Sequence, residues 1–155
     1  MGGRKITIRP ATLDDARFVR DHLRYHDRME LEAVAGSGKD LVSLSVAGSD
    51  RAYAAEADGE VFMLFGVGSG LISDTASVWA LGTDRCKDLP FTMVRLGRKI
   101  VHELLDEYAV MENFVDDRYS ASIRWLRLLG AHLGEPEPYG RDGKPFRRLL
   151  FYRGG

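Results

Sequence analysis

The chain has 155 residues, of which 45% are hydrophobic and 29% are charged, and its formal net charge is −1. This size and composition predict one domain, 1–155, with a core of its own, and they exclude a disordered or collagen-like chain. The single cysteine, Cys86, excludes an internal disulfide, and the longest run without a charged residue, 61–73, is shorter than the ~20 residues of a membrane helix. We therefore expect a soluble, intracellular, single-domain protein.

The first fifty residues predict one strand followed by helices. Residues 5–9 alternate in polarity and stop at Pro10, which is typical of a strand. Thr12 is expected to cap a helix, because two aspartates follow it in the first turn, where the helix dipole favours anions. A second helical segment is expected at 29–34. The apolar residues of 39–47 fit both the helical and the strand periodicity, and we favour a helix capped by Ser37.

From residue 51 the pattern is dominated by strands. Residues 51–57 and 60–67 predict a hairpin, because Asp58-Gly59 supplies the positive φ of a tight turn. The glycines that follow, 66, 68 and 70, predict a flexible loop rather than a nucleotide-binding loop, since a strand comes next. The remaining expected elements are strand 76–83, a helix from Pro90, strand 109–115, helix 119–129 closed by Gly130, and strand 146–152. This order predicts a mixed α+β sheet covered by helices.

The helix that begins at Pro90 carries its charges against its own dipole. The cations Arg95, Arg98 and Lys99 lie in its N-terminal half, and acidic residues lie at the other end. Arg85 and Lys87 add positive charge just before it. A phosphate-like anion bound at the helix N-terminus would explain this arrangement, and so would a solvated face with ion pairs along the helix.

Other candidate residues carry weaker signals. His22 and His26 have a metal-ligand spacing on one expected helix, but no third ligand accompanies them, so no metal site is predicted. Cys86 lies between two cations in a loop, and we expect an ordinary exposed thiol rather than a nucleophile. Basic and aromatic residues alternate in the tail, but a strand with a buried aromatic face explains them. The two halves of the chain differ only mildly in charge, so a nucleic-acid partner is not expected.

Two segments resemble the GNAT acetyltransferase superfamily. Ile6–Thr12, followed by Asp14-Asp15, is similar to its opening strand and helix, and Ile123–Ala131 is similar to its closing helix. A closer resemblance is to GNAT-like proteins of tailed phages, which include the small internal virion protein of short-tailed phages. The segments that carry it are Val78–Asp84, Asn113–Asp116, Ile123–Gly130 and Gly154-Gly155.

The resemblance implies a central, mostly antiparallel sheet flanked by helices on both faces, and acetyl-CoA as cofactor. In these enzymes a glycine-rich loop after the fourth strand cradles the pyrophosphate, and the matching segment here, 84–90, lacks those glycines. Tyr119 and Leu126 stand where the superfamily often has an asparagine and a general-acid tyrosine. The expected cofactor-binding residues are Leu81, Gly82, Thr83 and Cys86 by the resemblance, and Arg85, Lys87 and Arg95 by the charge at the helix N-terminus. A backbone N–H of 81–83 would stabilise the oxyanion. Glu30 would be the catalytic base, and the alternative is that it is an ordinary surface glutamate.

Two functions remain open. The first is a phage- or prophage-encoded acetyltransferase that binds acyl-CoA, or another anionic ligand, in the cytoplasm of a bacterial host and acts on an amine. The second is a non-catalytic GNAT-like protein of the virion or its assembly, with phage structural proteins as partners. No membrane partner is expected, and the sequence does not indicate an oligomeric state.

Overall fold

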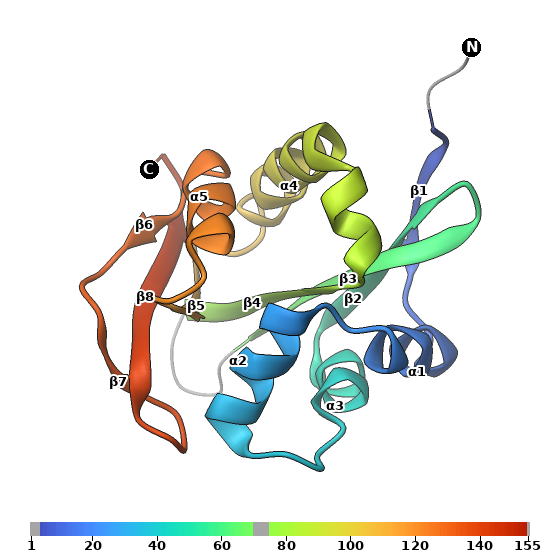
Figure 1. Cartoon of the computed structure of the whole chain (residues 1–155). Coiled ribbons are helices and arrows are strands. Elements are labelled where there is room, and N and C mark those ends of the chain that lie inside the picture. Colours follow the sequence, from blue (N-terminus) through green and yellow to red (C-terminus); the bar gives the residue numbers. More distant parts are fainter. Residues whose placement is uncertain (1–3, 70–74, 155) are drawn as a thin grey trace.

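A central sheet is covered on both faces by helices, as the resemblance predicts (Figure 1). The computed structural model describes residues 4–69 and 75–154. Helices α1, α2 and α3 lie on one face of the sheet, and α4 and α5 lie on the other. The helices are α1 Leu13–Asp21, α2 Tyr25–Ala35, α3 Leu41–Gly48, α4 Pro90–Leu104 and α5 Ser120–Leu128, and a short 3-10 helix, η1, spans Asp84–Asp88. None of the helices in the described part of the chain has the length and apolar character of a membrane span.

Eight strands form the sheet in the order β1-β2-β3-β4-β5-β8-β6, with β7 also paired to β8. They are β1 Ile6–Pro10, β2 Arg51–Ala57, β3 Glu60–Ser69, β4 Thr75–Gly82, β5 Val110–Asp116, β6 His132–Leu133, β7 Glu137–Tyr139 and β8 Lys144–Tyr152. All pairs are antiparallel except β4 with β5. The predicted hairpin is confirmed, and Asp58 and Gly59 at its turn both have positive φ.

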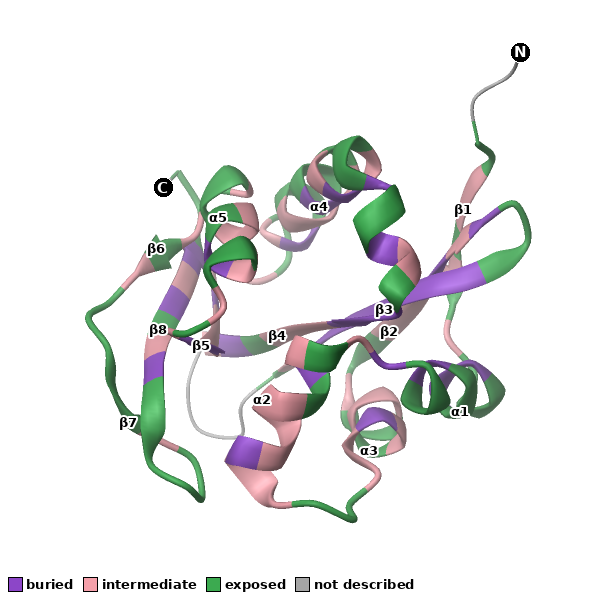
Figure 2. Cartoon of the chain, viewed as in Figure 1, coloured by how far each residue is buried: buried purple, intermediate pink, exposed green. Residues whose placement is uncertain are grey.

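The core has one layer on each face of the sheet (Figure 2). Beneath the sheet, Val19 of α1 and Val42 of α3 pack against Leu64 and Leu81. Above it, α4 and α5 cover a larger apolar layer that includes Phe62, Met111 and Phe151. The strongly apolar strand β3 is buried almost along its whole length, because both layers pack against it.

Helix α1 begins where the sequence predicts. The hydroxyl of Thr12 accepts the N–H of Asp15, and the Asp15 carboxylate accepts the N–H of Thr12 in return, which makes a capping box. The third helix is also confirmed, but its cap is Asp40 rather than Ser37. An aspartate directly before the helix reaches the orphan N–H groups of the first turn, which a residue three positions earlier does not.

Two further expectations are wrong, and two short strands were not expected. Gly66 and Gly68 belong to β3 and not to a flexible loop, while Gly70 lies outside the described residues. A Cβ at Gly66 would lie 2.7 Å from the indole ring of Trp79, so this glycine serves close packing. His22 ends α1 and His26 lies in α2, so the two histidines do not share a helix. The short strands β6 and β7 were not predicted, because two or three residues give no periodic signal.

Candidate functional site

Strands β4 and β5 separate along the sheet and leave a gap between them. Their pairing is limited to three residue pairs and ends at Ser77 and Glu112. Just beyond it, the Asn113 side chain enters between the strands: its Nδ2 donates to the carbonyl oxygen of Val78 at 2.6 Å, and its Oδ1 accepts the N–H of Phe114 at 2.7 Å. One carboxamide thus satisfies two backbone groups on facing strands, and the sheet opens without leaving either unpaired.

The backbone of β4 turns alternate residues toward this gap. Thr83 donates its N–H to Phe62 of β3, so Leu81 and Trp79 face β3 as well, and Val78, Ala80 and Gly82 face the gap. Both backbone groups of Gly82 are taken: its N–H donates to Asp27 Oδ2 at 2.8 Å, and its oxygen accepts the N–H of Arg24 at 2.9 Å. The expected oxyanion donors 81–83 are therefore already engaged within the protein. Ala80, beyond the last β4–β5 pair, directs its N–H into the gap.

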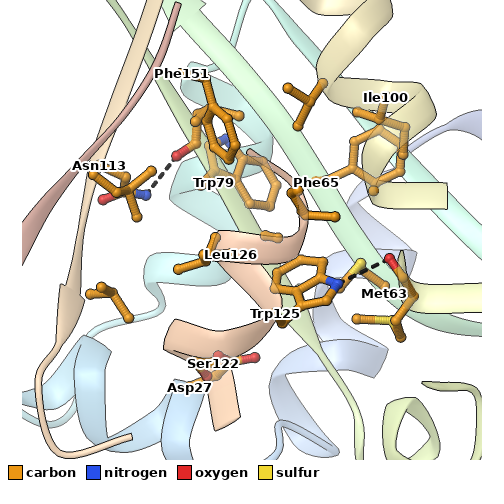
Figure 3. A pocket seen from close by; sticks show the side chains of 18 of the residues that line it. Asp27, Met63, Phe65, Trp79, Ile100, Asn113, Ser122, Trp125, Leu126 and Phe151 are labelled. Carbon is orange, nitrogen blue, oxygen red and sulfur yellow. Dashed lines mark hydrogen bonds between the residues drawn. The ribbon is translucent and has the colours of Figure 1, made fainter. Parts of the chain in front are cut away.

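Two cavities that share part of their lining lie on the α4–α5 side of the gap. The inner cavity, about 120 Å³, lies between the sheet and α4 and α5, and the side chains along it are drawn in Figure 3. The outer cleft, about 440 Å³, lies between η1, the start of α4, and α5. The residues that line both are Arg24, Met93, Ser122 and Trp125. The indole N–H of Trp125 donates to the carbonyl oxygen of Met93 at 3.0 Å, so α5 is fastened to α4 where the two cavities meet.

Glu30 lies at the α2 end of the inner cavity. Its carboxylate accepts the backbone N–H of Asp116, at the end of β5, at 3.2 Å. Burial, with the neighbouring carboxylate of Asp27, raises the pKa of Glu30 to about 8. A carboxyl group with this pKa releases and takes up protons close to neutral pH, as a general base must.

Arg24 and Asp27 form a buried ion pair beside Glu30. Arg24 Nε lies 2.6 Å from Asp27 Oδ2, and the side chains are only 15% and 6% exposed. The pair bonds to both backbone groups of Gly82 and so fixes α2 against the end of β4. The guanidinium of Arg24 places positive charge at the junction of the two cavities.

The predicted cations are divided between the outer cleft and the surface. Lys87 lines the cleft, together with Arg124 of α5. Arg85 instead lies 3.3 Å from Glu60 and 3.9 Å from Asp58, at the hairpin. Arg95 is exposed on α4 and lines neither cavity. The cations that line the cleft are therefore Lys87, Arg124 and Arg24.

The 3-10 helix η1 occupies the segment that matches, by the resemblance, the glycine-rich loop of GNAT enzymes and that lacks its glycines. Its first backbone N–H groups are engaged locally, since Arg85 donates to the Thr83 hydroxyl and Cys86 to the Thr83 carbonyl oxygen. Cys86 is buried and its thiol donates to Phe62, which corrects the expectation of an exposed thiol. Burial raises the pKa of Cys86 to about 11, so the thiol stays protonated and unreactive at neutral pH.

The structure brings Glu30, Thr83, Cys86 and Lys87 to the two cavities, and it adds residues that the sequence pattern missed. Arg24 and Asp27 have an i, i+3 spacing that is common on exposed helix faces and gives no sign of their burial. Ala80 carries no side-chain signal at all, because its contribution is a backbone N–H. Asn113 was part of a segment quoted for resemblance, but its bridging amide is visible only once β4 lies beside β5.

Comparison with known proteins identifies the fold. No protein-family model and no curated protein matches the sequence. Among solved structures, the chain is similar to the ribosomal-protein-alanine N-acetyltransferase of Brucella melitensis, with a TM-score of 0.69 and 16% identity over 95% of this chain and 99% of that one. It is similar to the spermidine N-acetyltransferase of Vibrio cholerae, in complex with CoA and spermine, with a TM-score of 0.69 and 10% identity over 95% of both chains.

A third similar structure is an acetyltransferase of the GNAT family from Streptococcus pneumoniae, with a TM-score of 0.65 and 15% identity over 97% of this chain and all of that one. The likeness to each covers nearly the whole chain at low identity. The chain therefore has the fold of the GNAT acetyltransferases.

Proposed function

We propose that this chain is an acyl-CoA-dependent N-acetyltransferase that acts on an amine, with Glu30 as its general base. The observation that carries the proposal is that Glu30 lines the same cavity as the residues of β4 that border the gap, and that its pKa is raised to about 8. The fold, which is that of acetyltransferases, agrees with this chemistry, although a fold by itself does not assign an activity.

The two cavities fit a long ligand with an anionic end. The outer cleft offers Lys87 and Arg124 for phosphate groups, in place of backbone donors that η1 has engaged. Beyond Arg24 the inner cavity is lined mostly by apolar side chains, which suits an acyl group. When bound there, acetyl-CoA supplies a thioester carbonyl that an amine can attack.

The residues around the gap have distinct roles in this reaction. Ionised Glu30 accepts the proton that the amine loses as the new N–C bond forms and the C–S bond breaks. The N–H of Ala80 donates a hydrogen bond to the carbonyl oxygen as negative charge develops on it. The cation of Arg24 stabilises the departing thiolate, and Asp27 holds Arg24 in place at 2.6 Å.

We further propose that the chain is encoded by a phage or prophage and acts in the cytoplasm of a bacterial host. The support is the resemblance of 78–84, 113–116 and 123–130 to GNAT-like proteins of tailed phages. These three segments belong to β4, β5 and α5, which together line the inner cavity. The resemblance therefore concerns the candidate site and not only the periphery of the fold.

A non-catalytic GNAT-like phage protein is the second candidate. The observation that favours it is η1, whose local hydrogen bonds replace the glycine loop that cradles pyrophosphate in GNAT enzymes. Such a protein would have phage structural proteins as partners and would be found in the virion. It would have no need of Glu30 in an ionisable form.

Calorimetric titration with acetyl-CoA separates the two candidates. We expect the wild type to bind acetyl-CoA with micromolar affinity. The double variant Lys87→Ala/Arg124→Ala should bind it about tenfold or more weakly, because two charge-assisted contacts disappear. Arg95→Ala, which removes an exposed cation of α4 that lines neither cavity, is the matched control and should bind acetyl-CoA like the wild type. Absence of heat at millimolar acetyl-CoA would exclude the enzyme and leave the second candidate.

A further inference from the structure

The inner cavity has two chemically different ends. Its charged lining residues, Arg24, Asp27 and Glu30, all come from α2 and the turn before it. The opposite end lies between the sheet and α4, where Figure 3 shows Ile100 and Phe151 far from Asp27. Apart from the carboxamide of Asn113, which is bonded to Val78, that end is lined by apolar side chains: Phe65, Val78, Ile100, Val101, Leu149 and Phe151.

The inner cavity as a whole is larger than an acetyl group requires. Its volume of about 120 Å³, charged end included, is close to the ~150 Å³ of an engineered apolar cavity that binds benzene, a molecule of six carbons. An acetyl group carries a single methyl beyond its carbonyl carbon. Such a small group would leave most of the apolar lining without contacts, whereas protein interiors are close-packed.

From this cavity we infer that the site selects an aliphatic acyl group of about four to six carbons, in preference to acetyl. The inference rests on the proposed function, since it names the acyl group that the same site would transfer. The carbonyl lies at the gap beside Ala80, and the chain extends away from Glu30 into the apolar end. No charged side chain lines that end of the cavity, so charged or strongly polar acyl groups are excluded from it.

Chain length should change the affinity in a defined way. Burial of each added methylene is expected to tighten binding about fourfold until the cavity is full. Butanoyl-CoA should therefore bind roughly ten- to twentyfold more tightly than acetyl-CoA. Dodecanoyl-CoA, which exceeds the volume, should gain nothing further from this cavity.

Calorimetric titration of the full chain with acetyl-, butanoyl-, hexanoyl- and dodecanoyl-CoA tests the inference. In Ile100→Phe the added ring fills the apolar end, so butanoyl and hexanoyl thioesters should lose about tenfold in affinity while acetyl-CoA changes by less than about twofold. Arg95→Phe adds the same side chain to the exposed face of α4 and should rank the four thioesters by affinity as the wild type does. Ile100→Ala enlarges the cavity and should move the optimum to a longer chain, which provides a second variant if Ile100→Phe does not fold.

The outcomes of this titration are distinct. Tighter binding of butanoyl- or hexanoyl-CoA, lost in Ile100→Phe and kept in Arg95→Phe, supports the inference. Equal affinity for all four thioesters, or the tightest binding for acetyl-CoA, overturns it and leaves the proposed function standing. Absence of heat with every thioester overturns the proposed function, and the inference falls with it.

Discussion

Glu30 makes the stability of the protein depend on pH in a predictable direction. Its pKa is raised from the ordinary 4.5 to about 8, mainly by burial. Between these values the folded protein holds a proton that the unfolded chain has released, so the free energy of unfolding falls as the pH rises from 4.5 to 8. One pKa unit corresponds to ~1.36 kcal/mol, and the full shift to about 5 kcal/mol.

The substitution Glu30→Gln isolates this contribution. Glutamine does not ionise, and its Oε1 can still accept the N–H of Asp116. We expect wild type and variant to have similar free energies of unfolding near pH 4.5. At pH 8.5 the variant should be more stable, by up to about 5 kcal/mol.

Urea denaturation at several pH values measures the difference between the two proteins. Groups that titrate alike in both cancel, so the difference reports Glu30 alone. Glu103→Gln, on the exposed face of α4, is the matched control. Its free energy of unfolding should stay close to that of the wild type at every pH. A difference between Glu30→Gln and wild type that does not change with pH would refute the reasoning, since it would mean that Glu30 titrates alike in the folded and unfolded chain.

Three further predictions concern single contacts. Asn113→Ala removes the amide that bridges β4 and β5 and should lower the free energy of unfolding in urea by about 2–4 kcal/mol, because two backbone groups lose their partners; a loss below about 1 kcal/mol would contradict this. Cys86 should not react with a thiol reagent in the folded protein and should react fully in urea, since it is buried with a pKa of about 11; rapid labelling of native protein would argue against that burial. Thr12→Ala should lower the free energy of unfolding by about 1 kcal/mol, as measured by thermal or urea unfolding. Thr12→Ser should keep most of the wild-type stability, because only the capping hydroxyl matters.

Much of the secondary structure is predictable from the sequence because its signals are local. Thr12 caps α1 through contacts within four residues, and Asp58-Gly59 closes the hairpin through its own positive φ. The periodicity of α4 reflects the face that it turns to the core. The resemblance of short segments then predicted the arrangement of sheet and helices.

The site is different, since its parts lie far apart in the sequence. Glu30 was chosen by resemblance alone. Only the fold desolvates it beside Asp27, which raises its pKa, and brings it within hydrogen-bond distance of Asp116, 86 residues later. Arg85 was expected near an anion because it precedes α4, but the fold turns it toward Glu60 of the hairpin. A charge pattern along the chain does not say which neighbour a long side chain will meet.

The sequence by itself determined the type and order of most strands and helices, because caps, turns and periodicity act over a few residues. The tertiary structure alone decided that the sheet opens at Asn113, that Ala80 offers its N–H there, and that Arg24 and Asp27 occupy the end of β4. These features depend on which backbone groups stay paired across strands and helices distant in sequence. Hydrogen-bond satisfaction at long range is a property of the folded chain, and no local pattern encodes it.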